Sequence, residues 1–221
     1  MKTQMNAYEE LISIRCDAAE VEGMLELPAD PVGLVLFAHG SGSSRLSPRN
    51  NYVAGELRAA RIGTLLMDLL TRREDQDYAM RFDIPLLTQR LNAIGDWIRQ
   101  YGLTQALPLG LFGASTGAAA ALQLAALRSD IAALVSRGGR PDLAGADALQ
   151  RVRAPTLLIV GGADDVVIDL NRSAYAALGC EKRLEIIPGA THLFEEPGKL
   201  EAVAALARGW FARHLIKPGA P

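Results

Sequence analysis

This 221-residue chain has few cysteines, few histidines and a small net charge, and each of these features argues against a class of protein. The two cysteines, Cys16 and Cys180, are too few for the disulfide framework of a small secreted domain, so we expect isolated buried thiols. The chain has no CxxC motif and no cluster of histidine and cysteine, which argues against a structural zinc site. Its net charge of −2 gives it no strong basic footprint for nucleic acid or an anionic membrane surface.

Long apolar runs are also missing. No stretch reaches the roughly 18 apolar residues that a membrane-spanning helix needs. Residues 1–15 lack the apolar core of a secretory signal peptide, and no repeat or low-complexity tract is present. We therefore expect a cytoplasmic protein with neither a nucleic-acid nor a membrane partner. The sequence alone leaves the oligomeric state open.

The chain does have many apolar residues, which make up 49% of it and can bury a substantial core. No linker rich in proline, glycine or serine divides the interior, so residues 1–221 are expected to form a single domain.

Apolar runs alternate with helical patterns along most of the chain. The segments 10–16 and 22–28 alternate with a period of two, as a half-exposed hairpin would, whereas 33–39 is continuously apolar, as a strand covered on both faces would be. Helix 51–63 is expected to end at Gly63. The sequence predicts an α/β fold with about eight mostly parallel strands, helices on both faces and an antiparallel N-terminal edge. Further strands are expected at 64–70, 107–113, 131–139, 154–164 and 182–190, and further helices at 83–102, from the elbow to about 128, at 170–178 and at 199–215.

The stretch LPLGLFGASTGAAAALQLAAL, residues 107–127, carries the most informative motif. The pattern G-x-S-x-G at 113–117 follows a predicted buried strand and opens an alanine-rich segment of high helix propensity. A sharp strand-to-helix turn of this kind strains the backbone at Ser115 and lifts its hydroxyl above the end of the strand, and the flanking glycines allow strand and helix to approach closely. Ser115 is therefore the candidate nucleophile. The alternative is a tight turn in which Ser115 only caps the helix.

A serine hydroxyl needs a base to become a nucleophile, and the chain offers three histidines. His192 lies on a loop between a predicted strand and the last helix, whereas His214 falls on the apolar stripe of that helix and is expected to be structural. In a fold with this elbow the acid and the histidine follow the serine along the chain, which excludes His39 and favours His192 as general base.

The base needs a carboxylate to orient it, and LLIVGGADDVV places two just beyond a predicted strand. We favour Asp164, the first acid after the turn, over Asp165; the alternative is a helix cap or a solvated pair. For the oxyanion, the backbone N–H groups of Thr116 and of Ser41, in the loop AHGSGSSR, are the expected donors. His39 is expected to brace that loop by hydrogen bonds.

These motifs, taken in order, resemble the α/β-hydrolase superfamily and, within it, the small dienelactone hydrolase-like and serine esterase members. The resemblance covers nearly the whole chain, through FAHGSGSSR, MDLL, GLFGASTGAAAAL, APTLLIVGGADDVV and PGATHLFEEPG. It implies a triad of Ser115, Asp164 and His192. Two departures stand out: dienelactone hydrolases use a cysteine where this chain has Ser115, and the short segment between the strands at 131–139 and 154–164 leaves no room for a large lid.

The resemblance implies hydrolysis of a small ester or lactone through an acyl-enzyme on Ser115, without a metal or an organic cofactor. Two alternatives remain: a catalytically idle domain that binds a ligand or a partner protein, and a non-hydrolytic reaction such as acyl transfer or perhydrolysis.

Arginines gather near the predicted site loops, and His39, Arg45 and Arg137 are the candidate substrate contacts. Arg137 follows a strand at its carboxyl end, where ligands bind in open α/β sheets, so it could recognise a carboxylate or phosphate. The alternative is a set of surface ion pairs. The charged segment 71–82 is either a mobile loop over the site or a solvated connection.

Overall fold

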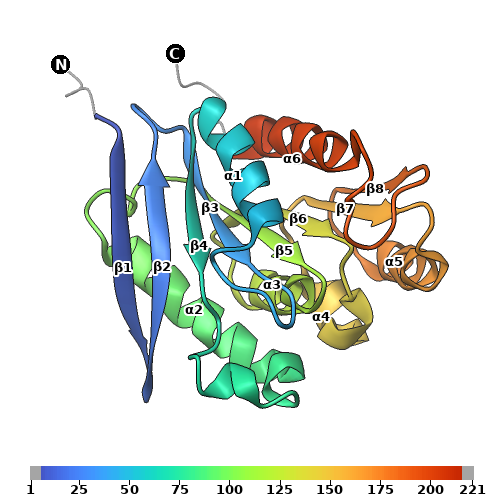
Figure 1. Ribbon diagram of the computed structural model, residues 1–221, viewed down its shortest axis with the longest axis horizontal. Helices are drawn as coiled ribbons and strands as arrows, with labels where there is room; N and C mark the ends of the chain where they lie inside the picture. Colours follow the sequence, from blue (N-terminus) through green and yellow to red (C-terminus); the bar gives the residue numbers. More distant parts are fainter. Residues whose placement is uncertain (1–5, 216–221) are drawn as a thin grey trace.

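Eight strands form one hydrogen-bonded sheet in the computed structural model, which describes residues 6–215 (Figure 1). The strand order is β1-β2-β4-β3-β5-β6-β7-β8, and β2 runs antiparallel to β1 and β4 while every other neighbouring pair is parallel. The mostly parallel sheet with an antiparallel N-terminal edge is thus confirmed. The strands are β1 Tyr8–Cys16, β2 Ala19–Leu27, β3 Gly33–Ala38, β4 Ile62–Met67, β5 Leu109–Ala114, β6 Ile131–Arg137, β7 Thr156–Gly161 and β8 Lys182–Ile187.

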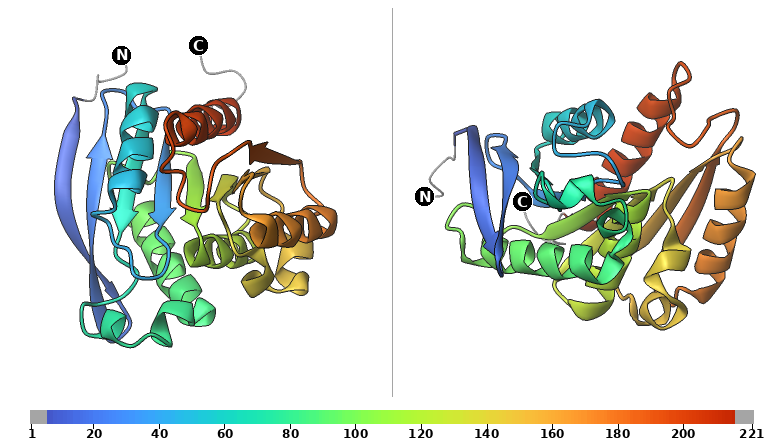
Figure 2. Two further views of the ribbon diagram at one scale, coloured as in Figure 1. Left: turned by 45° about the vertical axis from the view of Figure 1, so that its right-hand side comes forward. Right: turned by 60° about the horizontal axis from the view of Figure 1, so that its bottom comes forward.

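Helices cover both faces of the sheet (Figure 2). Helices α1 and α6 pack on each other over one face, where the buried core includes Phe37, Phe112 and Phe211. Helices α2 and α3 pack together over the other face. The helices are α1 Pro48–Ala59, α2 Ile84–Gln100, α3 Thr116–Leu127, α4 Ala146–Arg151, α5 Asp165–Ala177 and α6 Lys199–Leu215, with short 3₁₀ helices η1 Glu74–Gln76, η2 Met80–Phe82 and η3 Pro141–Ala144.

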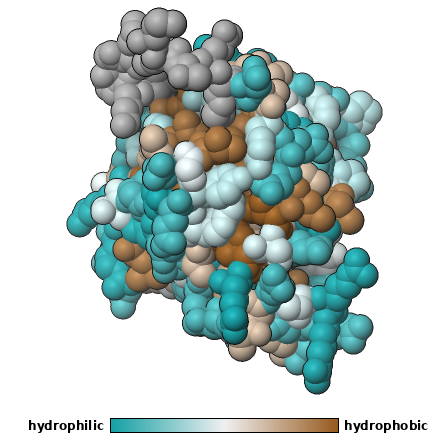
Figure 3. Space-filling model, turned by 90° about the vertical axis from the view of Figure 1, so that its left-hand side faces the viewer, coloured by the Kyte–Doolittle hydropathy of each residue, from teal (hydrophilic) through white to brown (hydrophobic). Residues whose placement is uncertain are grey.

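The burial of each strand follows from what covers it. Strands β3, β4, β5 and β7 are buried at every residue because helices lie on both sides, which is why they are continuously apolar. Strand β1 lies at the edge and alternates between exposed and buried positions in its C-terminal half. The face of the molecule on this side shows apolar patches among mostly hydrophilic side chains (Figure 3).

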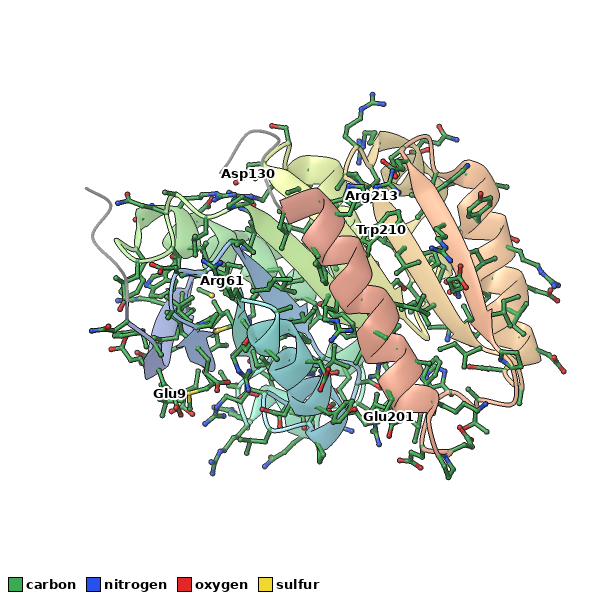
Figure 4. The ribbon with its side chains drawn as sticks, turned by 90° about the horizontal axis from the view of Figure 1, so that it is seen from above. Glu9, Arg61, Asp130, Glu201, Trp210 and Arg213 are labelled. Atoms are coloured by element: carbon green, nitrogen blue, oxygen red, sulfur yellow. The ribbon has the colours of Figure 1, made fainter. Side chains whose placement is uncertain are left out.

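Helix α6 crosses the strands of the central sheet diagonally (Figure 4). Trp210 on this helix is buried, and its indole N–H donates a hydrogen bond to the carbonyl oxygen of Pro155 at 3.2 Å. The imidazole of His214 lies 4.5 Å from the Trp210 ring, between centroids, and burial lowers its pKa. Both residues therefore belong to the packing of α6, as their place on its apolar stripe predicts.

Two boundary predictions are wrong, and one short helix was missed. Helix α1 ends at Ala59, and Arg61 rather than Gly63 adopts the left-handed conformation, with φ of 62°, because β4 begins at Ile62 and already contains Gly63. Helix α5 begins at Asp165, five residues before the predicted start at 170, because the chain turns into the helix at once after β7. The short helix α4 was not predicted.

The parallel strands bring their following loops to one edge of the sheet. The loop after β3, the turn after β5, the turn after β6, the start of α5 and the loop after β8 all begin at this carboxyl edge. Between β6 and β7 the chain forms only η3 and α4, so no large lid is present. Within residues 6–215, no helix has both the length and the apolar content to cross a bilayer.

Candidate active site

Ser115 forms a strained corner between β5 and α3. Its φ of 51° and ψ of −121° lie outside the regions that side-chain-bearing residues usually occupy, which costs on the order of 1–3 kcal/mol. The corner is fixed by two backbone hydrogen bonds to the turn after β6: the Ser115 N–H donates to the Arg137 carbonyl oxygen at 3.2 Å, and the Arg140 N–H donates to the Ser115 carbonyl oxygen at 3.1 Å. The side chain of Ser115 is half-buried at the carboxyl edge of the sheet.

The glycines on either side of Ser115 are required by close backbone contacts. A Cβ added at Gly113 would lie 2.4 Å from the Cα of Ala118 in the first turn of α3. A Cβ added at Gly117 would lie 2.3 Å from the carbonyl oxygen of Ala38 at the end of β3. Since backbone atoms stand in the way in both cases, no side chain fits at either position.

His192 and Asp164 are hydrogen bonded to each other. The Nδ1 atom of His192 lies 2.7 Å from Oδ2 of Asp164, and the two side chains are 37% and 18% exposed. Asp164 occupies the N-cap position of α5, but its side chain accepts no hydrogen bond from the helix and is used for His192 instead. Asp165 is exposed in the first turn of the helix, and the imidazole forms its hydrogen bond with Asp164 instead.

The loop that carries His192 is held down by close packing over β7. A Cβ added at Gly161 would lie 2.5 Å from the carbonyl oxygens of both Ala190 and Thr191, so the loop needs a glycine beneath it. Phe194, two residues after His192, is fully buried with φ of 58°, an unusual conformation for a bulky residue. Sequence reasoning missed both supporting residues, because neither lies in a motif that predicts such a conformation.

Ser115 and His192 both contact the turn after β6. A Cβ added at Gly138 would lie 3.4 Å from Cε1 of His192, and the neighbouring carbonyl of Arg137 accepts the hydrogen bond from Ser115 described above. The serine and the imidazole therefore lie against successive residues of a single turn.

The loop after β3 lies against Ser115. A Cβ added at Gly40 would lie 3.0 Å from the Ser115 Cβ, and Ser41 and Thr116 line a small shared pocket. Within residues 6–215, neither backbone N–H of Ser41 and Thr116 donates to a backbone acceptor. Both donors are thus free to hold an oxyanion, and Thr116 is the first residue of α3, where the helix dipole favours negative charge.

His39 braces this loop from inside the protein. Its Nδ1 lies 2.9 Å from the Gly40 carbonyl oxygen, and its Nε2 accepts a hydrogen bond from the Leu69 N–H at 3.0 Å. Burial lowers the pKa of the imidazole, which favours the neutral form that this arrangement needs. Both ring nitrogens are thus used in holding the loop. His39 also lines the small pocket that Ser41 and Thr116 share, so its contact with substrate stays a prediction.

The predicted arginine contacts divide into two kinds. The Arg45 guanidinium forms ion pairs with Asp68 at 2.5 Å and Glu22 at 2.9 Å, which favours the alternative of an ion-paired arginine; its contact with substrate stays a prediction. Arg137 is buried and has no hydrogen-bond partner for Nε or Nη1.

Most residues of the charged segment 71–82 are exposed, but Arg81 lies against the loop after β3. Arg81 in this segment is held by Asp75, with Nε 3.0 Å from Oδ1, and its Nη1 would lie 3.3 Å from a Cβ added at Gly42. Arg81 also lines the small pocket shared by Ser41 and Thr116. Sequence reasoning did not single out Arg81, because nothing in the local pattern places one arginine of this segment over the loop.

No metal centre competes with this arrangement in the part of the chain that the structure describes, where no three His, Cys, Asp or Glu side chains gather suitably for a metal ion. A larger surface hollow of about 630 Å³ lies at the opposite, amino edge of the sheet, lined by Arg99, Asp130 and His214 among others. It is lined by none of the candidate site residues Ser115, Asp164 and His192.

Comparison with known proteins defines the family. A scan against models of protein families finds no match. The crystal structure of a dienelactone hydrolase from Anabaena variabilis is 52% identical in sequence, superimposes with a TM-score of 0.91, and covers 96% of this chain and 100% of that one. Esterase Est1E from Butyrivibrio proteoclasticus shares the fold at 16% identity, with a TM-score of 0.80 over 94% of this chain and 99% of that one. A lidless α/β serine hydrolase from Xanthomonas campestris does so at 19% identity, with a TM-score of 0.79 over 100% of both chains.

The chain therefore belongs to the α/β-hydrolases, and within them to the dienelactone hydrolase-like group. Two curated Mycobacterium tuberculosis relatives, one from each of two strains, are 54% identical over 212 residues and carry the provisional name phosphoribosyl transferase. The match covers 96% of this chain but only 48% of each relative, so the chain spans about half their length.

Proposed function

We propose that this protein is a serine hydrolase that cleaves small esters or lactones through an acyl-enzyme on Ser115. The observation that carries the proposal is the hydrogen bond of 2.7 Å between His192 and Asp164, beside a serine held at a strained corner. A carboxylate that accepts from Nδ1–H leaves Nε2 of the imidazole free to act as a base.

In the proposed reaction, Ser115 Oγ attacks the carbonyl carbon while His192 takes the hydroxyl proton. The negative charge that develops on the carbonyl oxygen is held by the N–H groups of Thr116 and Ser41. His192 then gives its proton to the leaving oxygen, and the acyl group stays on Ser115. A water molecule, deprotonated by His192, attacks the acyl-enzyme and releases the acid. Asp164 stabilises the imidazolium in both halves of the reaction.

The lack of a large lid supports small substrates. The short connection between β6 and β7 adds little surface at the carboxyl edge that could bind a long acyl chain. Short acyl esters and lactones need the least binding surface, and they are the substrate class that we assign.

The name of the two curated relatives belongs to a different class of enzyme. Those proteins are about twice as long as the segment that matches this chain, which covers 48% of them. We attribute the transferase name to the half that this chain does not match. The dienelactone hydrolase from Anabaena variabilis, matched over its full length, supports hydrolase chemistry for this half.

The test is turnover of p-nitrophenyl acetate and butyrate by the wild type and by Ser115→Ala, together with labelling by a fluorophosphonate and mass spectrometry. We expect one label on Ser115, and a loss of turnover in the variant on the order of 10³-fold or more. Labelling of another residue, or turnover that survives the substitution, would contradict the assignment.

The same experiment separates the alternatives. A catalytically idle domain gives neither label nor turnover with the wild type. A protein that labels at Ser115, turns over slowly in water and releases p-nitrophenol faster when an alcohol or hydrogen peroxide is added performs acyl transfer or perhydrolysis instead of hydrolysis. The acyl group then leaves as an ester or a peracid.

A further inference from the structure

Arg137, the last residue of β6, carries a buried guanidinium without a partner. The residue is 8% exposed, and its Nε and Nη1 atoms are enclosed with no hydrogen-bond acceptor. No carboxylate in residues 6–215 forms an ion pair with it, although the other buried arginine, Arg90, is paired with Glu74. Buried cations are normally paired because desolvation is costly, so an unpaired one needs an explanation.

The strand pattern shows which way this side chain points. Ala133 and Val135 on β6 belong to the core beneath α1 and α6, whereas Leu134 belongs to the core on the opposite face. Since side chains alternate along a strand, Arg137 projects to the α1 side, where Phe194 of the histidine loop is also buried.

A second cation belongs to helix α1, which covers this face of the sheet. The positive charge of Arg49, in the first turn of α1, adds to burial in lowering the pKa of Arg137 to about 10. Arg49 is held by one acid, with Nη1 2.7 Å from Oε1 of Glu195 in the histidine loop, while its Nε is enclosed without an acceptor. Two guanidinium groups and one carboxylate leave one positive charge uncompensated.

The main chain of the residue that carries this charge lies beside the candidate nucleophile. The backbone of Arg137 accepts the hydrogen bond from the Ser115 N–H, and the next residue, Gly138, lies against the His192 ring. A ligand group bound to the Arg137 side chain would therefore lie within one side-chain length of the turn that contacts Ser115 and His192.

We propose that Arg137, with Arg49 beside it, forms a binding site for a small anionic group, a carboxylate or phosphate that brings one net negative charge. Unpartnered N–H donors of a guanidinium match the oxygens of such groups, and burial strengthens the attraction. The anion is either the acid group of the substrate, which rests on the proposed function, or a free anion that occupies the site. Arg81 and Arg45 do not supply this site, because their side chains are held by Asp75 and Asp68.

The first test compares a neutral and an anionic ester with the same leaving group: p-nitrophenyl butyrate and the mono-p-nitrophenyl ester of glutaric acid. For a substrate-borne anion, Arg137→Gln and Arg137→Met should lower kcat/KM for the glutarate ester at least about tenfold relative to the butyrate ester. Arg140→Gln is the matched control, because Arg140 follows on the same turn but is already paired with Asp142 at 2.7 Å. It should leave the ratio unchanged.

The second test measures binding without catalysis. Thermal unfolding of the Ser115→Ala protein is followed in sodium phosphate and in sodium chloride at equal ionic strength. Phosphate should raise Tm more in this protein than in the double variant that also carries Arg137→Met. In chloride alone, Arg137→Met should leave Tm unchanged or raise it, because it removes an unpaired buried charge; a merely structural arginine would give a lower Tm.

The outcomes separate as follows. If the Arg137 variants lose kcat/KM for the glutarate ester relative to the butyrate ester, the anion is carried by the substrate. If phosphate raises Tm through Arg137 but the ratio of kcat/KM values does not change, the anion is a free one. Neither effect, or an equal loss in Arg140→Gln, overturns the proposal. If both Arg137 variants fail to fold, Arg49→Gln, whose side chain is 31% exposed, replaces them with the same expected direction. Labelling of Ser115 and turnover of the neutral ester by the wild type show separately whether the proposed function holds.

Discussion

The imidazole of His192 and the carboxylate of Asp164 lie 2.7 Å apart, although 27 residues separate them in the sequence. Asp164 follows β7 and His192 follows β8, and these two strands are parallel neighbours in the sheet. Their carboxyl ends therefore bring the start of α5 close to the loop that carries His192. The pair fixes the orientation of the imidazole, so its loss should affect chemistry more than substrate binding.

Replacing Asp164 by Asn should keep the shape of the site and remove the charge. In comparable triads this change lowers kcat by about 10³- to 10⁴-fold, because the imidazolium loses its partner and the wrong tautomer is favoured. Steady-state turnover of p-nitrophenyl butyrate measures the effect, with KM expected to change much less than kcat.

Asp165→Asn is the matched control for that substitution. Asp165 is exposed in the first turn of α5 and the imidazole forms its hydrogen bond with Asp164 instead, so turnover should remain within about twofold of the wild type. If the Asp165 variant lost activity and the Asp164 variant kept it, the roles of the two acids would be exchanged.

Gly117→Ala should prevent normal folding. The added methyl group would lie 2.3 Å from the Ala38 carbonyl oxygen, and neither α3 nor β3 can move without disrupting the sheet. We expect an insoluble protein, or one destabilised by at least about 3 kcal/mol in urea unfolding. Gly55→Ala in α1 is the control, since the nearest atom to its added Cβ is the end of the Arg58 side chain at 3.9 Å, and it should stabilise by about 0.5–1 kcal/mol.

Because His39 is buried, the free energy of unfolding should decrease when the pH is lowered slightly below neutral. Burial holds its pKa below the ordinary value of 6.5, so the unfolded chain takes up a proton at a pH where the folded protein does not. The contribution of His39 is therefore present above about pH 6.5 and is lost as the pH falls. Urea unfolding at pH 7.5 and 5.5 should show a smaller loss for His39→Gln than for the wild type; equal losses would argue against this role.

The ionised side chain of Glu74 should increase the free energy of unfolding at neutral pH, and this contribution should disappear in strong acid. Its carboxylate is held by the buried Arg90 guanidinium and by Thr71, and these hydrogen bonds lower its pKa from 4.5 to about 2. The contribution is complete above about pH 4.5 and is lost as the pH falls towards 2. Glu74→Gln should thus unfold at lower urea than the wild type at pH 7, with the difference shrinking by pH 3; a constant difference would contradict the assignment.

The local sequence was most informative at positions where backbone contacts allow only one type of residue. The G-x-S-x-G pattern predicts the strained corner at Ser115, and the structure gives the physical reason in the contacts of Gly113 and Gly117 with Ala118 and Ala38. The order of strands and helices likewise predicts the parallel sheet, because continuously apolar runs separated by helices have few other ways to be buried.

Predictions about side-chain partners were less successful. Arg45 and Arg137 look alike in the sequence, yet Asp68 and Glu22 neutralise the first while nothing in the described chain neutralises the second. The end of α1 was misplaced for a similar reason, since the start of β4 at Ile62 requires a turn at Arg61 even though a glycine is available two residues later.

The sequence by itself determined the fold class, the strained corner at Ser115 and the small set of acids and histidines that could serve it, because backbone strain, strand burial and helix propensity are local properties. The order of the motifs also favoured Asp164 as the partner of His192 and His39 as a brace, and the hydrogen bonds agree with both. Only the tertiary structure decided that the guanidinium of Arg45 is paired while that of Arg137 is not, because these contacts depend on how the loops at one sheet edge fold over one another. Such contacts between residues far apart in the chain are set by packing, and no motif distinguishes the two arginines.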